Sequence, residues 1–251
     1  MSRIIAIANH KGGVGKTTSV ATIGAILANK GYRTLLIDLD AQANLTSSFL
    51  KTEPEETIYN ALKGETALPI IPLRENLSIV ASCLDMAGVE LDLTSRISRE
   101  FILHKLLKPI VLKGEYDYIL FDCPPSLGLV TINALVAAKE LFIPLTAEAL
   151  PSRGLAKLTN IVQMVRENLN EDITLSGVII TRWEGTNLSK MVEEQLRELF
   201  GGTIFKTKIR KNVSIAEAPL YAMDVVSYAP DSNGARDYIS LTEEILAQER
   251  K

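Results

Sequence analysis

Short runs of hydrophobic residues alternate along this chain with longer segments in which hydrophobic residues recur every three or four positions. The short runs are rich in isoleucine, valine and leucine, which is typical of strands buried on both faces of a parallel sheet. The longer segments have the spacing of amphipathic helices. The predicted strands are residues 3–9, 33–39, 76–81, 116–121, 141–145 and 174–181. The predicted helices are residues 17–30, 57–63, 99–112, 127–139, 153–169, 188–200 and 237–248.

This alternation predicts an α/β fold of the doubly wound type, in which helices flank a mainly parallel sheet of about seven or eight strands. Glycines at Gly31, Gly64 and Gly201 follow predicted helices, where a left-handed residue commonly ends a helix. The stretch 51–98 is the least regular and predicts loops with short helices. No repeat, linker or low-complexity tract interrupts the pattern, so we expect one domain over residues 1–251.

Composition narrows the class of protein further. The 251 residues include 27 basic and 30 acidic side chains, so any nucleic-acid binding needs a local basic patch. The two cysteines, Cys83 and Cys123, lie far apart and suggest a reducing compartment rather than a disulfide framework. The first residues lack the pattern of a signal peptide. No hydrophobic run reaches the roughly 18 to 20 residues of a membrane span, so we expect a cytoplasmic protein.

A glycine-rich loop follows the first predicted strand and opens the first predicted helix, which is the context of a phosphate-binding P-loop. Its glycines let successive backbone N–H groups turn toward phosphate oxygens, and the helix adds its positive end. Lys16 is placed to reach the β- and γ-phosphates, and the Thr17 hydroxyl to bind Mg²⁺. The expected contacts to ATP or ADP are Lys11, Gly12, Gly13, Val14, Gly15, Lys16, Thr17 and Thr18.

The loop departs from the plain P-loop pattern because His10 occupies the first glycine position and a second lysine, Lys11, follows it. Lys-Gly-Gly-x-Gly-Lys-Thr-Thr resembles the deviant Walker A motif of the ParA, MinD and iron-protein superfamily. That resemblance implies two subunits facing each other over two ATP molecules, with Lys11 acting on the nucleotide of the partner. The alternative is a solvated loop lysine. His10 is interpreted as a loop residue with a local hydrogen bond.

Three aspartates end predicted strands, at the edge where parallel sheets bind ligands. Asp122 fits a Walker B acid that holds the magnesium shell. Asp40 resembles the switch I aspartate of ParA proteins, which orients the attacking water. For Asp38 two interpretations stay open, because it could hold magnesium waters or anchor the loop. Capping by Asp122 and Asp40 is the weaker alternative for these two residues.

Further motifs extend the resemblance to ParA proteins of the short, Soj-like type. Residues 38–44 resemble the family run D-x-D-P-Q-G-N, with Ala41 and Ala43 in place of Pro and Gly. Residues 121–126 resemble its Walker B and switch II, 216–219 its S-E-A-P, and 228–235 its Y-D-P-x-S-x-G-A. The resemblance implies a slow, partner-stimulated ATPase that forms an ATP-sandwich homodimer. It also implies non-specific DNA binding on the nucleoid and a ParB-type partner in the partition of chromosome, plasmid or other cargo.

One dense basic run, residues 206–211, is the candidate DNA contact. On an extended segment, alternate spacing would place Lys206, Lys208 and Arg210 on one face, and phosphate contacts of this kind are independent of sequence. The alternative is an ordinary solvated strand. The expected DNA contacts are Lys206, Lys208, Arg210, Lys211 and Arg236, and Arg197 could extend the patch. Glu148 and Arg182 are further candidates for contact with the nucleotide.

Three other functions fit parts of the sequence. A MinD-like membrane-cycling ATPase needs a basic amphipathic C-terminal helix, but the tail 241–251 is rich in acids and lacks aromatic anchors, so no stable membrane binding is expected. An iron-protein-like redox ATPase needs paired cysteines facing a dimer axis, which Cys83 and Cys123 do not match. A scaffold that binds nucleotide without hydrolysing it is disfavoured by Asp40.

Overall fold

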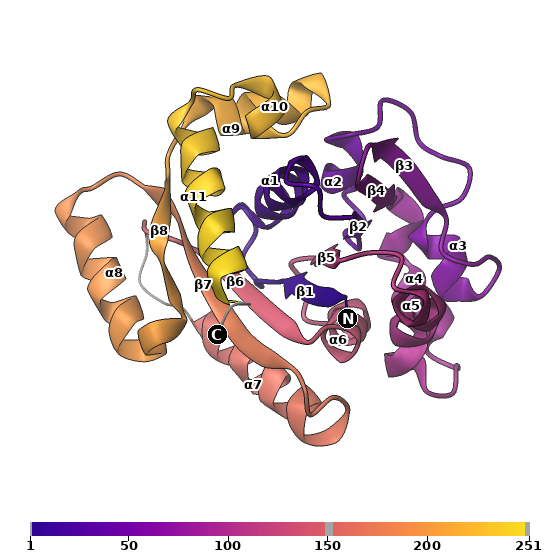
Figure 1. The fold of residues 1–251 in the computed structure, drawn as a ribbon. Coiled ribbons are helices and arrows are strands. Elements are labelled where there is room, and N and C mark those ends of the chain that lie inside the picture. Colours follow the sequence, from indigo (N-terminus) through magenta and orange to yellow (C-terminus); the bar gives the residue numbers. More distant parts are fainter. Residues whose placement is uncertain (1, 149–152, 249–251) are drawn as a thin grey trace.

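The structure is a computed structural model that describes residues 2–148 and 153–248 (Figure 1). The strands within these ranges are β1 (Arg3–Ile7), β2 (Thr34–Asp38), β3 (Ile70–Arg74), β4 (Leu77–Val80), β5 (Tyr118–Asp122), β6 (Glu140–Thr146), β7 (Thr174–Trp183) and β8 (Ile204–Arg210). The α-helices are α1 (Lys16–Asn29), α2 (Asn44–Ser47), α3 (Ile58–Lys63), α4 (Val89–Leu93), α5 (Ile102–Lys113), α6 (Leu129–Ala137), α7 (Arg153–Asn168), α8 (Asn187–Phe200), α9 (Val213–Glu217), α10 (Val225–Tyr228) and α11 (Asn233–Gln248). The 3₁₀ turns are η1 (Leu84–Ala87), η2 (Arg99–Phe101), η3 (Gly201–Thr203) and η4 (Ala218–Tyr221).

The described strands form one eight-stranded sheet in the order β3-β4-β2-β5-β1-β6-β7-β8. Every neighbouring pair is parallel except β3 and β4, which form an antiparallel edge. The doubly wound, mainly parallel α/β fold predicted from the sequence is therefore confirmed. The register sets Ile7 and Asp38 on either side of Asp122, so β1, β2 and β5 end at the same level. This places the P-loop and two of the candidate carboxylates at one edge of the sheet.

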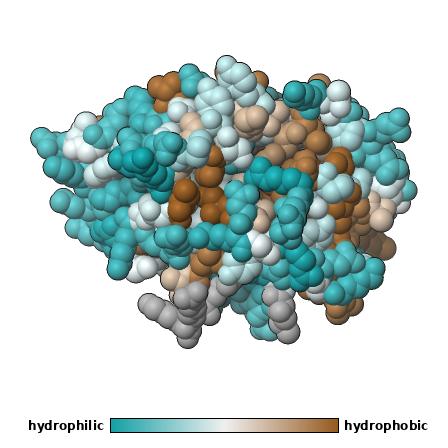
Figure 2. Space-filling model, turned by 45° about the horizontal axis from the view of Figure 1, so that its top comes forward, coloured by the Kyte–Doolittle hydropathy of each residue, from teal (hydrophilic) through white to brown (hydrophobic). Residues whose placement is uncertain are grey.

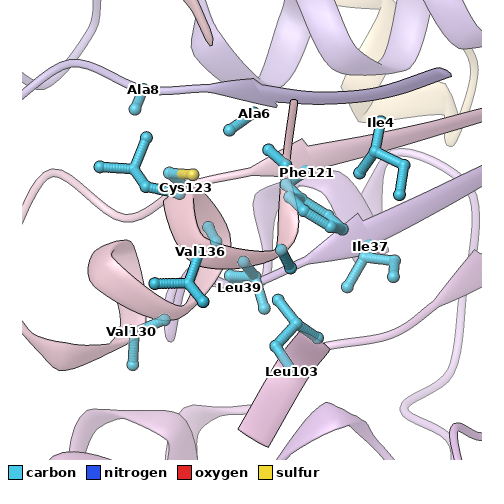
Figure 3. Packing of buried hydrophobic residues seen from close by; sticks show 14 of the residues in the cluster. Ile4, Ala6, Ala8, Ile37, Leu39, Leu103, Phe121, Cys123, Val130 and Val136 are labelled. Carbon is cyan, nitrogen blue, oxygen red and sulfur yellow. The ribbon is translucent and has the colours of Figure 1, made fainter. Parts of the chain in front are cut away.

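Helices cover both faces of the sheet because the strands alternate two sets of buried side chains. On one face, α1 and α11 pack over Ile5, Ile7 and Leu36. On the other face, α5, α6 and α7 pack over Ile4, Phe121 and their neighbours. Figure 3 shows this packing for Leu103 of α5 and for Val130 and Val136 of α6. Helix α8 covers the β7–β8 end of this sheet through a separate small cluster. Both faces are thereby excluded from water, which a parallel sheet requires.

The structure departs from the predicted elements in several places, one of which is β8, a strand that the predicted set does not contain. The irregular stretch 51–98 contains an unpredicted strand, β3, whose Pro72 and half-exposed pattern hide the alternation that would have marked it. The segment 99–112 begins as the turn η2, and its α-helix runs over Ile102–Lys113. The last helix begins at Asn233 rather than at residue 237. At this start, the Ser232 hydroxyl accepts from the Ala235 N–H at 3.1 Å.

Candidate active site

The loop between β1 and α1 is wound by left-handed glycines. Gly13 has a φ of 71° and Gly15 a φ of 90°, and Gly15 is the N-cap residue of α1. A side chain would be strained in either conformation, which explains the glycines at these positions. The Asn9 side chain fixes the start of the loop, since it donates to the Pro144 carbonyl at 2.7 Å and accepts from the Lys11 N–H at 3.0 Å. No sequence pattern indicated this role of Asn9.

Two distant elements hold the remainder of the loop. The buried Thr181 hydroxyl, on β7, donates to the Val14 carbonyl at 2.9 Å. The Tyr238 hydroxyl, on α11, lies 3.1 Å from the Ser19 hydroxyl in the first turns of α1. Burial raises the pKa of Tyr238 to about 12, so its hydroxyl stays protonated. The C-terminal helix is therefore part of the support for this loop.

A cavity of about 780 Å³ opens beside the loop, with a volume in the range of small-molecule sites. Its walls combine the glycine loop, the segment after β2, the end of β7 and the segment after β8. The lining residues are Gly12, Gly13, Val14, Gly15, Lys16, Thr17, Thr18, Asp40, Gln42, Asn44, Ser47, Ser48, Pro125, Thr181, Arg182, Ile209, Arg210, Lys211, Asn212, Val213, Ile215, Ala216, Pro219 and Tyr238. The lining thus combines the polar groups of the glycine loop with apolar side chains such as Val213, Ile215 and Pro219 from the segment after β8.

The outer wall of the cavity holds one of the two further nucleotide candidates. Arg182 lines the cavity and has a φ of 53°, a left-handed conformation. Glu148 is exposed and lies 3.1 Å from the Arg182 Nε. The structure therefore brings the two residues together, with Arg182 between Glu148 and the cavity, and their contact with a nucleotide stays a prediction.

The two lysines of the loop have different environments. Lys16 is only 7% exposed, and its Nζ lies 3.4 Å from the Lys11 carbonyl. Lys11 is exposed, and its side chain makes no hydrogen bond or ion pair within residues 2–148 and 153–248. The Lys16 ammonium therefore lies at the cavity, whereas the Lys11 side chain is exposed outside its lining.

Asp122 is a buried carboxylate without a hydrogen-bond partner among the described residues, for either of its oxygens. Burial and the neighbouring Asp38 raise its pKa well above the usual value. The nearby Thr17 hydroxyl and Lys16 ammonium lower the pKa and offset part of this rise. An orphaned buried carboxylate costs free energy unless a cation meets it. The arrangement beside the Thr17 hydroxyl fits Mg²⁺, a cation that prefers oxygen ligands.

Asp38 is bound to the chain that follows it. Its carboxylate accepts from the Thr46 N–H at 2.8 Å, the Thr46 hydroxyl at 2.7 Å and the Asp40 N–H at 3.1 Å. Burial raises the pKa of Asp38 to about 6. The Thr46 hydroxyl also accepts from the Ser82 N–H at 2.8 Å. These contacts favour the loop-anchoring interpretation, while a role of Asp38 in holding magnesium waters stays a prediction.

Asp40 is half-buried and lines the cavity. Its carboxylate accepts from the Gln42 N–H at 3.0 Å, and its carbonyl accepts from the Ser82 hydroxyl at 2.7 Å. Three residues after Asp40, Ala43 has a φ of 50°, the conformation in which glycine is favoured. The alanine that replaces the family glycine is thus held in the glycine conformation.

The predicted basic patch is largely neutralised within the chain. The Lys208 Nζ lies 2.7 Å from Glu193 of α8 and over the Trp183 ring, whereas the Arg210 guanidinium binds Asp237 of α11 at 2.6 Å. Lys208 and Arg210 therefore contact different helices rather than sharing one open face. Lys211 pairs with Glu184 at 2.8 Å, and Arg197 pairs with Glu193 at 2.7 Å.

Lys206 and Arg236 are the exposed members of the predicted DNA surface whose side chains have no ion pair in the described part of the chain. Lys206 precedes the ion-paired Lys208 on β8, and Arg236 lies in the first turns of α11. The role of the whole surface in DNA binding stays a prediction.

The residues on which the alternative functions depend are buried. Cys123 is fully buried beneath the sheet (Figure 3), and the Cys83 sulfur lies 3.2 Å from the Thr57 hydroxyl. The apolar residues of the C-terminal helix, including Leu241 and Ile245, pack against the fold. Across residues 2–148 and 153–248, no helix combines the length and hydrophobicity that crossing a bilayer requires.

Comparison with known proteins decides the family. A family model described as an AAA domain matches residues 2–175. The sporulation initiation inhibitor protein Soj of Bacillus subtilis is 41% identical over 253 residues, covering 98% of this chain and 99% of that protein. The chain belongs to the Soj/ParA family. Another Soj/ParA relative, the chromosome partitioning protein ParA of Caulobacter vibrioides, is 36% identical over 254 residues, which cover 99% of this chain and 95% of that protein.

Solved structures agree with a Soj/ParA fold. Cobyrinic acid a,c-diamide synthase from Mycobacterium smegmatis, with a bound ATP analog and magnesium, superposes with a TM-score of 0.87 at 30% identity. The superposition covers 100% of this chain and 97% of that chain. The resemblance to ParA proteins drawn from the sequence motifs is thus confirmed, and the nucleotide and the metal in that structure match those expected for this site.

Proposed function

We propose that this chain is a partition ATPase that hydrolyses ATP to ADP and phosphate within an ATP-bound homodimer. The observation that supports this most directly is the pairing of a buried Lys16 with an exposed, unpaired Lys11 in one glycine loop. The near full-length similarity to Soj and ParA supports a role in moving chromosome, plasmid or other cargo.

Each group of the site has a role in transferring the γ-phosphoryl group to water. The loop N–H groups and Lys16 bind the phosphate oxygens and stabilise charge that develops on them. Asp40 orients the attacking water from the rim of the cavity. Asp122 and the Thr17 hydroxyl would hold Mg²⁺, which when bound neutralises charge shared between the β- and γ-phosphates. Asp38 keeps Asp40 in place through its bonds to the loop.

Lys11 completes the site of the other subunit. Its backbone is fixed by Asn9, whereas its ammonium has no partner in the described chain. In a dimer that faces two loops toward each other, this ammonium would meet the partner's γ-phosphate. A cation supplied in this way accelerates phosphoryl transfer by about 10³- to 10⁵-fold in other enzymes. Hydrolysis would then depend on pairing, and the loss of the γ-phosphate would favour separation.

The ATP-bound dimer is proposed to bind double-stranded DNA without sequence preference, through Lys206 and Arg236 of both subunits. A dimer doubles the number of cations, and affinity for DNA falls steeply with salt in proportion to the phosphates contacted. A ParB-type protein would stimulate hydrolysis and thereby release the dimer from the nucleoid.

Light scattering and DNA retention test these steps separately. With Mg²⁺ and ATP, an Asp40→Ala variant should accumulate as a dimer, and a persistent monomer would contradict the sandwich. Lys206→Gln with Arg236→Gln should weaken retention on non-specific duplex DNA and lower its salt dependence. The matched control is Lys105→Gln with Lys108→Gln, two exposed lysines of α5. Equal weakening by both pairs would place the DNA surface elsewhere.

A further inference from the structure

A short segment between β4 and α5 has one apolar side in the core and another in water. Met86, Val89 and Leu93 are at most 4% exposed and pack into the core. Between and beyond them, three large aliphatic side chains are 72%, 82% and 93% exposed, namely Leu84, Leu91 and Ile97. We define these three as the outer patch. Figure 2 shows one face of the molecule, which is largely hydrophilic with hydrophobic residues gathered in a few places.

The segment is bonded to the loop that carries Asp40. Ser82 donates its hydroxyl to the Asp40 carbonyl at 2.7 Å and its N–H to the Thr46 hydroxyl at 2.8 Å. Leu84 lines a smaller cavity of about 280 Å³ together with Gln42, which also lines the large cavity. The outer patch therefore begins beside the loop that we propose positions the attacking water.

The same segment is bonded to the chain after Asp122. The Glu90 carboxylate accepts from the Val130 N–H at 3.3 Å, in the first turn of α6. A side chain at Gly128 would collide with Glu90, because a β-carbon there would lie 2.2 Å from the carboxylate oxygen. The glycine thus admits Glu90 to the helix end that follows Pro125 and Ser126. A movement of the segment 82–93 would therefore reach both the loop that carries Asp40 and the start of α6.

The charge around the outer patch indicates what covers it. Residues 84–93 contain three acids, Asp85, Glu90 and Asp92, and no basic residue. The next basic residues are Arg96, which donates to the Leu62 carbonyl, and Arg99, which pairs with Glu100, so residues 84–100 hold four acids and two bases. A second copy of this chain, docked by the same face around a two-fold axis, would bring like charges together. A partner segment with apolar and basic side chains would pack its apolar residues on the outer patch and place its basic residues near these acids.

We propose that the outer patch is the docking surface for the activating partner, and that the partner contributes an apolar segment flanked by lysine or arginine. This inference rests on the proposed function, because it locates the partner that stimulates hydrolysis. Docking acts through Ser82 on the Asp40 loop and through Glu90 on the start of α6. Ser82 and Glu90 are positioning residues, since neither lines the nucleotide cavity.

The test measures ATP turnover against the concentration of a purified ParB-type protein, with Mg²⁺ and non-specific DNA present. Leu91→Ser with Ile97→Ser should raise the half-saturating concentration by at least about tenfold, while turnover without the partner stays unchanged. The control is Leu188→Ser with Leu199→Ser on α8, which are 48% and 63% exposed at the opposite end of the molecule (Figure 1). Asp85→Lys should also raise the half-saturating concentration and reduce its salt dependence.

Ser82→Ala separates transmission from docking. It should lower the maximal stimulated rate without changing the half-saturating concentration, whereas loss of docking alone changes the latter. Normal stimulation of the Leu91 and Ile97 double variant, or an equal loss in the α8 control, would overturn this inference alone. If that double variant instead failed to dimerise in ATP without the partner, the surface would belong to a second copy. If the wild-type chain showed no stimulation, the activating partner assigned under the proposed function would fall, and this inference with it.

Discussion

The Thr46 hydroxyl is the link between the candidate catalytic loop and its support, and replacing it with an isosteric group tests that link. Thr46→Val removes two hydrogen bonds, one donated to Asp38 at 2.7 Å and one accepted from Ser82 at 2.8 Å. Ser82 is fully buried, so its N–H would be left without an acceptor. An unsatisfied buried donor costs about 1–3 kcal/mol, and a lost bond to a carboxylate about 1.5–3 kcal/mol. We expect the free energy of unfolding to fall by about 2.5–6 kcal/mol, the sum of these two contributions.

The chain offers a matched control for this change. Thr22, in α1, is also fully buried, but its hydroxyl has no hydrogen-bond partner among the described residues. Thr22→Val therefore makes the same chemical change without losing a bond, and it should alter stability by less than about 1 kcal/mol.

Urea unfolding of both variants measures the difference, and steady-state ATP turnover measures its consequence. Thr46→Val should also lower turnover, because Asp38 and Ser82 both hold the segment that carries Asp40. Thr22→Val should retain turnover. Equal stabilities of the two variants would refute the anchoring role of Thr46, and a destabilised Thr46→Val variant with full turnover would separate that anchoring from catalysis.

Three further predictions concern the site itself. Lys16→Ala should weaken ATP binding by at least about tenfold in isothermal titration, since hydrogen bonds to charged groups contribute about 1.5–3 kcal/mol, and unchanged affinity would remove Lys16 from the phosphate site. Asp122→Asn should raise the magnesium concentration needed for half-maximal turnover, whereas chelation of magnesium should abolish turnover in the wild-type chain; an unchanged magnesium requirement would exclude Asp122 as the metal-holding acid. Ala43→Gly should leave stability unchanged or raise it by up to about 1 kcal/mol in urea unfolding, because relief of left-handed strain outweighs the added freedom of the unfolded chain, and clear destabilisation would show that Ala43 is not strained.

The fold was largely predictable because its signal is local. Buried strands such as Thr34–Asp38 and Tyr118–Asp122 are mainly apolar runs that end in an acid, and the helices between them have regular spacing. The edge strand β3 was not predictable in this way, because it is half-exposed and contains a proline. The alternation of strands and helices predicts the parallel strands of the sheet. It does not predict where an additional antiparallel strand joins the edge.

The residues of the candidate site that lie within one sequence motif could be predicted. The residues that support the site from distant parts of the chain could not. The loop glycines and Lys16 lie within a few residues of each other, so spacing alone identified them. The support from Asn9, Thr181 and Tyr238 depends on β6, β7 and α11 lying beside the loop. For the basic run, spacing predicted a shared face for Lys208 and Arg210. In the structure, Lys208 pairs with Glu193 of α8 and Arg210 with Asp237 of α11, and spacing within the run cannot predict such long-range ion pairs.

Mixing two inactive variants tests the central claim, that Lys11 completes the site of the partner. A Lys11→Ala subunit keeps its own Asp40, and an Asp40→Ala subunit keeps its own Lys11. If Lys11 acts across the dimer, the mixed dimer contains one complete site, and an equimolar mixture should regain about a quarter of the wild-type turnover per subunit, since about half of the dimers are mixed. If the mixture remains as inactive as either variant alone while mixed dimers form, Lys11 does not act on the partner's nucleotide.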